Sequence, residues 1–309
     1  MSAADRNVEF TSSRIGAVLI SDLIQYLSSG LTVGSVYALI ALGFTLIYNS
    51  TQIANFAQGD FAMIGAMTTV FAMASGVPII AAAVLGAAAA ALAGLLLYTL
   101  GIRPARNSPV LGLIVLTIGA SIFAKGAAQL VFDKRFHSLP SWIGASSIDI
   151  LGAAVQPQSF IVLAGAGVIV IGLAAFASRT LIGKGIAAVS QNSLAATLVG
   201  MNVPMVVTLA FVVSAAIGGI AGILAAPITL TSYDAGTLLS LKGFAAAMIG
   251  GMGNPVGAVL GGLLLGIGEA FGGGLISSAY KDAFAFLLIL LVLVVRPQGL
   301  VGSRVRERV

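Results

Sequence analysis

The sequence predicts an all-α membrane protein, a polytopic bundle of about eight or nine transmembrane helices, some of them broken or re-entrant. Of its 309 residues, 59% are hydrophobic and 8% are charged, whereas soluble domains carry about 25% charged residues. Mean hydropathy is +1.08. Glycine contributes 39 residues, and small residues let membrane helices approach closely. A compact helical bundle in lipid is therefore expected.

Apolar windows close to the roughly 20 residues that span a bilayer give the expected helices. They lie at 31–49, 60–76, 78–102, 109–131, 159–178, 204–227, 256–275 and 283–296. A shorter apolar stretch, Gly243–Met252, is either a further crossing or a re-entrant half-helix. Residues Ile15–Gly30 contain Asp22 and Gln25, and we expect an interfacial helix or an extension of the first span.

A single transmembrane domain is expected over residues 1–309, with polar segments between the helices. We expect 1–14 to form a polar N-terminus, 132–158 an external loop, 179–203 a cytoplasmic loop and 297–309 a cytoplasmic tail. This orientation follows from the positive residues, which collect on the cytoplasmic side. They form three clusters: Arg103 and Arg106; Arg179 and Lys184; Arg296, Arg304, Arg306 and Arg308.

A polar break in the apolar pattern is the first feature that points to function. The letters N-F-A-Q-G-D at 55–60 place Asn55, Gln58, Gly59 and Asp60 at the start of a new helix. Lipid excludes non-helical backbone unless protein or a water-filled cavity satisfies it, and interrupted spans mark substrate paths. Two interpretations follow: these residues cap the helix, or they supply polar groups to a translocation path.

Two further polar features join the candidate path. The letters G-G-M-G-N-P at 250–255 form a second break that contains Asn254 and has the same two interpretations. Glu269 lies inside a glycine-rich span, and a carboxylate within the membrane is a functional hypothesis by default. The alternative is a structural Glu269 that is hydrogen-bonded to a neighbouring helix.

Glycines in the same span predict helix packing. Gly257, Gly261, Gly268 and Gly272 fall within about 60° of arc on a helix, so they form one smooth face. Such faces let a second helix pack closely.

The loop after Arg179 contains a candidate docking segment. Leu194, Leu198 and Met201 have the i, i+4, i+7 spacing of an amphipathic helix. A short helix of this kind suits binding to a soluble partner, and a plain connector is the alternative.

Several chemistries find no support in the sequence. Gly183-Lys184 lacks the upstream glycine and the following Ser or Thr of a phosphate-binding loop, so we expect no ATP binding by this chain. There are no cysteines and one histidine, so no metal site is expected. A membrane enzyme would need clustered acids or histidines, and Asp60, Asp234 and Glu269 are scattered.

Longer motifs carry a resemblance to a known family. They are Y-A-L-I-A-L-G-F-T-L-I-Y, I-A-N-F-A-Q-G-D-F-A-M-I-G-A, K-G-F-A-A-A-M-I-G-G-M-G-N-P-V-G-A-V-L-G-G and R-P-Q-G-L-V-G. Together they resemble the H-type permeases of branched-chain amino acid ABC transporters, over nearly the whole chain. The resemblance implies a bacterial inner-membrane subunit that imports branched-chain or other hydrophobic amino acids. A homologous M-type permease, two cytoplasmic ATPase subunits and a periplasmic binding protein would complete the importer. ATP would be used by the partners, with no cofactor on this chain and no enzymatic activity of its own.

The resemblance also implies a coupling helix and two departures from the family pattern. Family permeases carry an E-A-A-x-x-x-G-like segment that inserts into the ATPase. Ala195, Ala196 and Gly200 match it, with Leu198 between them, but Leu194 stands in place of the acidic residue. The family also has histidine where this chain has Gln58.

Other transport functions remain open from the sequence. Similar permeases carry urea, other amides and aromatic acids. A self-sufficient channel or secondary transporter is the alternative from another class, and it would conduct substrate without ATP or partners.

Overall fold

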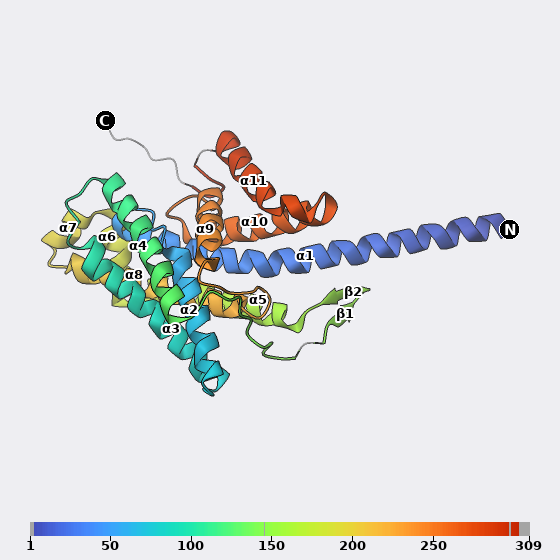
Figure 1. The fold of residues 1–309 in the computed structure, drawn as a ribbon. Helices are drawn as coiled ribbons and strands as arrows, with labels where there is room; N and C mark the ends of the chain where they lie inside the picture. The colour runs from blue at the N-terminus through green and yellow to red at the C-terminus, as the bar shows by residue number, and fades with distance from the viewer. Residues whose placement is uncertain (1–2, 145, 297, 303–309) are drawn as a thin grey trace.

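The computed structural model describes residues 3–144, 146–296 and 298–302, with side chains of the first helix described from Ile20 onward. Helices dominate it, and one two-stranded hairpin interrupts them (Figure 1). In chain order the elements are α1 (Ala3–Thr51), α2 (Gln58–Ala74), α3 (Ile79–Leu96), the π-helix η1 (Leu97–Ile102), α4 (Val110–Val131), β1 (Ile148–Ile150), β2 (Ala153–Val155), α5 (Pro157–Arg179), α6 (Leu181–Gln191), α7 (Ser193–Leu198), α8 (Val203–Ala225), α9 (Ala235–Gly250), α10 (Pro255–Leu275), the 3₁₀-helix η2 (Ser278–Tyr280) and α11 (Lys281–Val295).

The predicted polytopic helical bundle is confirmed. Seven segments among the described residues are long and apolar enough to cross a membrane: Ile20–Thr51, Ile79–Ile102, Val110–Val131, Pro157–Arg179, Val203–Ala225, Pro255–Leu275 and Ser278–Val295. Helices α2 and α9 are shorter. Helix α2 has 17 residues and α9 has 16, so at 1.5 Å per residue both fall short of a hydrocarbon core of about 30 Å.

Two expected boundaries need correction. Most of the stretch Gly243–Met252 belongs to α9, which begins at Ala235, includes Lys242 and ends at Gly250. The stretch Ile15–Gly30 is not a separate interfacial helix, because α1 runs without interruption from Ala3 to Thr51. Its N-terminal half extends well beyond the other helices (Figure 1). Of the two alternatives for this stretch, the extension of the first span is the one found.

Glycines bring the central helices into backbone contact. On one face of α10, Gly262 and Gly266 lie against Ala38 and Gly34 of α1, where an added Cβ would meet backbone atoms. The predicted glycine face lies on the other side: Gly257 and Gly261 contact α9, and Gly268 and Gly272 contact Leu288 and Phe284 of α11. Helix α10 is therefore held between three helices by positions that tolerate no side chain.

Described members of the predicted basic clusters lie at one end of the bundle. A buried apolar cluster there joins the end of α1, the end of η1, helix α6 and the start of α8. Arg103 follows η1 and Lys184 lies in α6. Helices α6 and α7 lie at the opposite end from the N-terminus of α1 (Figure 1). Arg304, Arg306 and Arg308 lie outside the described residues.

The loop at 132–158 contains structure that the sequence did not predict. Strands β1 and β2 pair antiparallel, with Ile148 opposite Val155. An isolated bridge joins His137 to Thr231, after α8. Gly152 of the hairpin turn lies beside Ser21 of α1, so this loop packs on the end of the bundle opposite the basic clusters.

Residues 298–302 form a C-terminal strap across the end of α9. Leu300 N donates to Ile249 O at 2.8 Å, and Val301 N donates to Gly250 O at 3.1 Å. Gly251 and Gly299 have φ of 102° and 77°, a region that favours glycine, and their backbones touch. The strap thus satisfies carbonyls that a helix end leaves unpaired.

Replacement of Gly266 by alanine is expected to destabilise the protein, because one methyl group would collide with the backbone of Gly34. The expected cost is about 1–3 kcal/mol, measured as a lower thermal unfolding midpoint in detergent. Gly172→Ala on α5 is the matched control, since nothing lies within 4 Å of its added Cβ. Equal midpoints for the two variants would contradict the packing described for α1 and α10.

Candidate functional site

The polar break lies inside the bundle and not at its surface. After α1 ends at Thr51 the chain turns back, and α2 begins at Gln58. The Gln58 side chain is fully buried and contacts Ser214, halfway along α8. Helix α2 therefore begins among other helices, where every backbone group needs a protein partner.

Side chains from two other helices satisfy the backbone of the break. Phe56 N donates to Thr117 Oγ1 of α4 at 3.2 Å. Ser240 of α9 acts twice: its hydroxyl donates to Phe56 O at 2.8 Å and accepts from Gly59 N at 2.7 Å. The one hydroxyl of Ser240 thus replaces a helical hydrogen bond across the start of α2.

Gln58 fixes the same region to α1 and α8. Its Nε2 donates to Ser214 O at 3.1 Å. Ser214 Oγ lies 2.9 Å from Gln58 Oε1 and 2.8 Å from Gly43 O, so its hydroxyl donates to either acceptor. A Cβ on Gly43 would overlap the Gln58 amide, so the missing side chain of Gly43 makes room for this network.

Capping does not account for the polar residues of the break. Helix α2 has no side-chain cap. Asn55 is buried, and its Oδ1 accepts from Ala57 N at 3.2 Å, ahead of the helix. Asp60 lies in the first turn of α2, and neither carboxylate oxygen has a protein hydrogen-bond partner. The capping interpretation is therefore wrong for Asp60.

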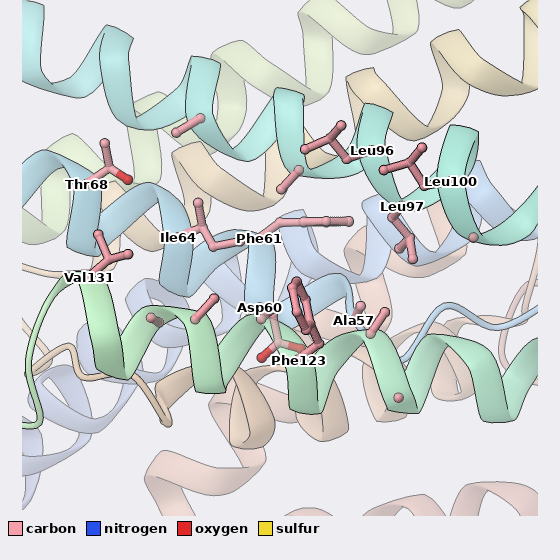
Figure 2. A pocket seen from close by; sticks show the side chains of 18 of the residues that line it. Ala57, Asp60, Phe61, Ile64, Thr68, Leu96, Leu97, Leu100, Phe123 and Val131 are labelled. Carbon is pink, nitrogen blue, oxygen red and sulfur yellow. The ribbon is translucent and has the colours of Figure 1, made fainter.

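Asp60 lies where the starts of α2 and α9 meet. Its Oδ1 is against Gly236 in the first turn of α9, so the positive ends of two helices surround one carboxylate. Ser121 and Lys125 of α4 lie near this carboxylate. Asp60 also borders a cavity of about 690 Å³ between α2, α3, η1 and α4 (Figure 2).

The other two candidate path residues lie apart from the break and from each other. Asn254 caps α10, and its Oδ1 accepts from Val256 N and Gly257 N. Its Nδ2 donates to Val301 O of the C-terminal strap. Glu269 is four turns further along α10, about 22 Å away at 1.5 Å per residue. The six candidates therefore do not form one site.

Glu269 belongs to a charge cluster that joins four helices, in which Glu269 and Lys242 are buried and Lys281 and Asp282 are exposed. Its Oε1 lies 2.8 Å from Lys242 Nζ and 3.3 Å from Lys281 Nζ, and Lys242 lies 2.7 Å from Asp282. Tyr37 of α1 donates to Glu269 Oε2 at 2.9 Å, and its ring centroid is 5.5 Å from Lys242 Nζ. The buried Glu269 is thus paired with the buried Lys242, as buried charges require, and one further cation and one further carboxylate lie at the exposed side.

The candidate coupling segment is exposed at the basic end of the bundle. Helix α7 begins after Asn192, whose Oδ1 accepts from Ala195 N. Leu194 and Leu198 are 70% and 80% exposed, while Ala196 is buried. The expected continuation of this stripe to Met201 is wrong, because α7 ends at Leu198 and the chain turns at Gly200, whose φ is 86°. Met201 packs back on the bundle.

Sequence reasoning missed the partner residues of both networks: Thr117, Ser214 and Ser240 around the break, and Tyr37, Lys242, Lys281 and Asp282 around Glu269. The three hydroxyl residues sit singly in apolar helices, where they usually bond to their own backbone, so no local pattern separates them. Lys242 did carry a signal, since a lysine within an apolar stretch needs a buried partner. Among the described residues, no group of three or more His, Cys, Asp or Glu could hold a metal ion.

Loss of the Ser240 hydroxyl is expected to destabilise the break. Ser240→Ala would leave Phe56 O and Gly59 N unpaired in the interior, at about 1–3 kcal/mol for each buried group. The measurement is the thermal unfolding midpoint of the purified protein. Ser178→Ala is the control, because its exposed hydroxyl bonds only to its own helix. A midpoint for Ser240→Ala that matches the control would contradict the bridging role.

Known proteins match this chain over most of its length. The family described as branched-chain amino acid transport system, permease component, matches residues 26–293. The high-affinity branched-chain amino acid transport system permease protein BraD of Pseudomonas aeruginosa is 33% identical, covering 93% of this chain and 98% of BraD. LivH of Escherichia coli, a protein of the same description, is also 33% identical, covering 93% of this chain and 97% of LivH.

A further relative is named for the transport of a different substrate, a sugar. The galactofuranose transporter permease protein YtfT of Escherichia coli is 28% identical, over 88% of this chain and 80% of YtfT. The family match covers most of the chain and agrees with the multi-pass helical architecture. The chain therefore belongs to the family of branched-chain amino acid transport system permeases.

Proposed function

We propose that this chain is a permease subunit of an ATP-driven importer for branched-chain or other hydrophobic amino acids in a bacterial inner membrane. The observation that carries the proposal is the 33% identity, over 93% of the chain, to permeases named for branched-chain amino acid transport. A second, homologous permease completes the translocation path, two cytoplasmic ATPases drive it, and a periplasmic binding protein delivers the substrate.

The break between α1 and α2 is the part of the path that this chain supplies. Asn55, Gln58, Gly59 and Asp60 lie at a point where two short helices, α2 and α9, begin side by side within the bundle. Short, interrupted helices of this kind carry substrate sites in transporters. Asn254 and Glu269 support the helices around the path through a cap and a charge cluster, without direct contact with the break.

Helices α6 and α7 transmit the ATPase motion. Leu194 and Leu198 are apolar and exposed at the end of the bundle where the basic residues gather, which is the cytoplasmic side by the positive-inside rule. Ala196 packs inward, so a force applied to the exposed leucines reaches the ends of α1 and α8 through the same apolar cluster.

A sugar is the competing substrate class. YtfT, named for galactofuranose, shares this scaffold at 28% identity. Reconstitution with the cognate partners and binding protein separates the two: uptake of radiolabelled leucine and isoleucine is expected, and it should require ATP. Uptake of galactofuranose instead would assign the sugar. Leucine flux without ATP or partners would support a self-sufficient channel and contradict the importer.

A charge on the exposed face of α7 is expected to uncouple transport. Leu198→Glu places a carboxylate where an apolar partner surface binds, so ATPase co-purification and leucine uptake should fall at least about tenfold. Leu198 suits this test better than Gly200, where the backbone φ of 86° would strain any side chain. Ile143→Glu is the control, since Ile143 is 67% exposed in the loop at the opposite end. Normal uptake by the Leu198→Glu transporter would exclude the coupling role.

A further inference from the structure

The cavity between α2, α3, η1 and α4 is apolar apart from two side chains. Its volume is about 690 Å³, and the described residues that line it are aliphatic, aromatic or glycine except for Asp60 and Thr68. Figure 2 shows Asp60 reaching from α2 toward α4 beside Phe123, with leucines of α3 and η1 across the space. Pockets of this size and composition bind small apolar molecules that carry one or two polar groups.

Asp60 is not needed to satisfy the protein around it. It is 1% exposed, and neither of its oxygens meets a protein hydrogen bond. The backbone groups of the break are satisfied by other side chains, namely Ser240, Thr117 and Asn55. A buried carboxylate without a hydrogen bond is costly, and the two helix ends beside it offset that cost only in part.

We propose that Asp60 binds the ammonium group of a hydrophobic amino acid whose side chain occupies this cavity; this rests on the proposed function. The ammonium supplies the charge-assisted donors that Asp60 lacks. The aliphatic side chain lies against Leu97, Leu116 and Phe123. Lys125 is the cation on α4 whose charge reaches Asp60.

Access to the carboxylate requires α4 to move outward. Both oxygens of Asp60 are covered: α9 lies against Oδ1, and α4 lies beside the carboxylate on the cavity side (Figure 2). Helix α4 is loosely held, because only four of its 22 residues are buried and it packs mainly on α2 and η1. Two of those four, Thr117 and Ser121, face the break and Asp60, so a shift of α4 opens the break and the cavity together.

The test is equilibrium binding of radiolabelled leucine to the assembled permease–ATPase complex in nanodiscs, without binding protein. Two competitors divide leucine into its parts: 3-methylbutylamine keeps the ammonium, and 4-methylpentanoate keeps the carboxylate. The amine is expected to displace leucine from the wild-type complex and the acid to be much weaker. Asp60→Asn should weaken leucine binding at least about tenfold and abolish the preference for the amine.

Two further variants keep the test decisive. Asp149→Asn makes the same chemical change at an exposed hairpin position and should bind leucine normally. Gly119 lines the cavity with nothing within 4 Å of an added Cβ, so Gly119→Leu fills the space without a clash and should reduce binding. If the Asp60→Asn complex fails to assemble, leucine binding to the Gly119→Leu complex becomes the test. Binding as tight as in the wild type would overturn the proposal.

Uptake by the complete wild-type importer distinguishes a failure of the ammonium site from a failure of the proposed importer function. If it imports leucine while Asp60→Asn binds leucine as tightly as the wild type, the ammonium site is wrong and the importer function stands. If 4-methylpentanoate displaces leucine as strongly as 3-methylbutylamine does, the ammonium site is also wrong and the importer function still stands. If the complete wild-type importer moves no branched-chain amino acid, the proposed function itself fails.

Discussion

The hydrogen bonds of the broken backbone between α1 and α2 are the constraint on which the rest of the bundle depends. Lipid offers no partner for free N–H and C=O groups, so a chain that leaves its helix must find partners on other helices. Thr117 of α4 and Ser240 of α9 supply them, while Ser214 of α8 holds the Gln58 side chain. These three helices come together around a segment of a few residues, which makes the break the centre of the bundle and not a defect in it.

Close packing of glycines makes this arrangement possible. A serine hydroxyl reaches the backbone of another helix only when the two helices are close, and Gly43, Gly59 and Gly236 remove the side chains that would keep them apart. The absence of side chains at the glycines of α10 likewise lets this helix contact α1, α9 and α11 at once. The charge cluster around Glu269 then ties α11 to the bundle at one polar point, although most of that helix faces outward.

Sequence patterns predicted the helices well and the site in part. Hydropathy and helix length follow from local composition, so the spans and the polar break at 55–60 could be recognised directly. The partners of the break could not, because a lone Ser240 in an apolar helix looks the same whether it bonds to its own turn or to another helix. Asn254 and Glu269 were grouped with the break because they are polar residues in apolar surroundings. In the structure neither contacts the break, and the length of α10 separates the two residues from each other. In the loop 132–158 the hairpin packs against α1 and His137 pairs with Thr231, and no short pattern records such distant contacts.

The C-terminal strap ties the order of synthesis to the completion of the fold. Ile249 and Gly250 leave the ribosome before α10 and α11, yet their carbonyls obtain their partners only from Leu300 and Val301. These two hydrogen bonds can therefore form only after two more helices have been made and inserted. A nascent chain interrupted before the strap would lack both of these hydrogen bonds at the turn into α10.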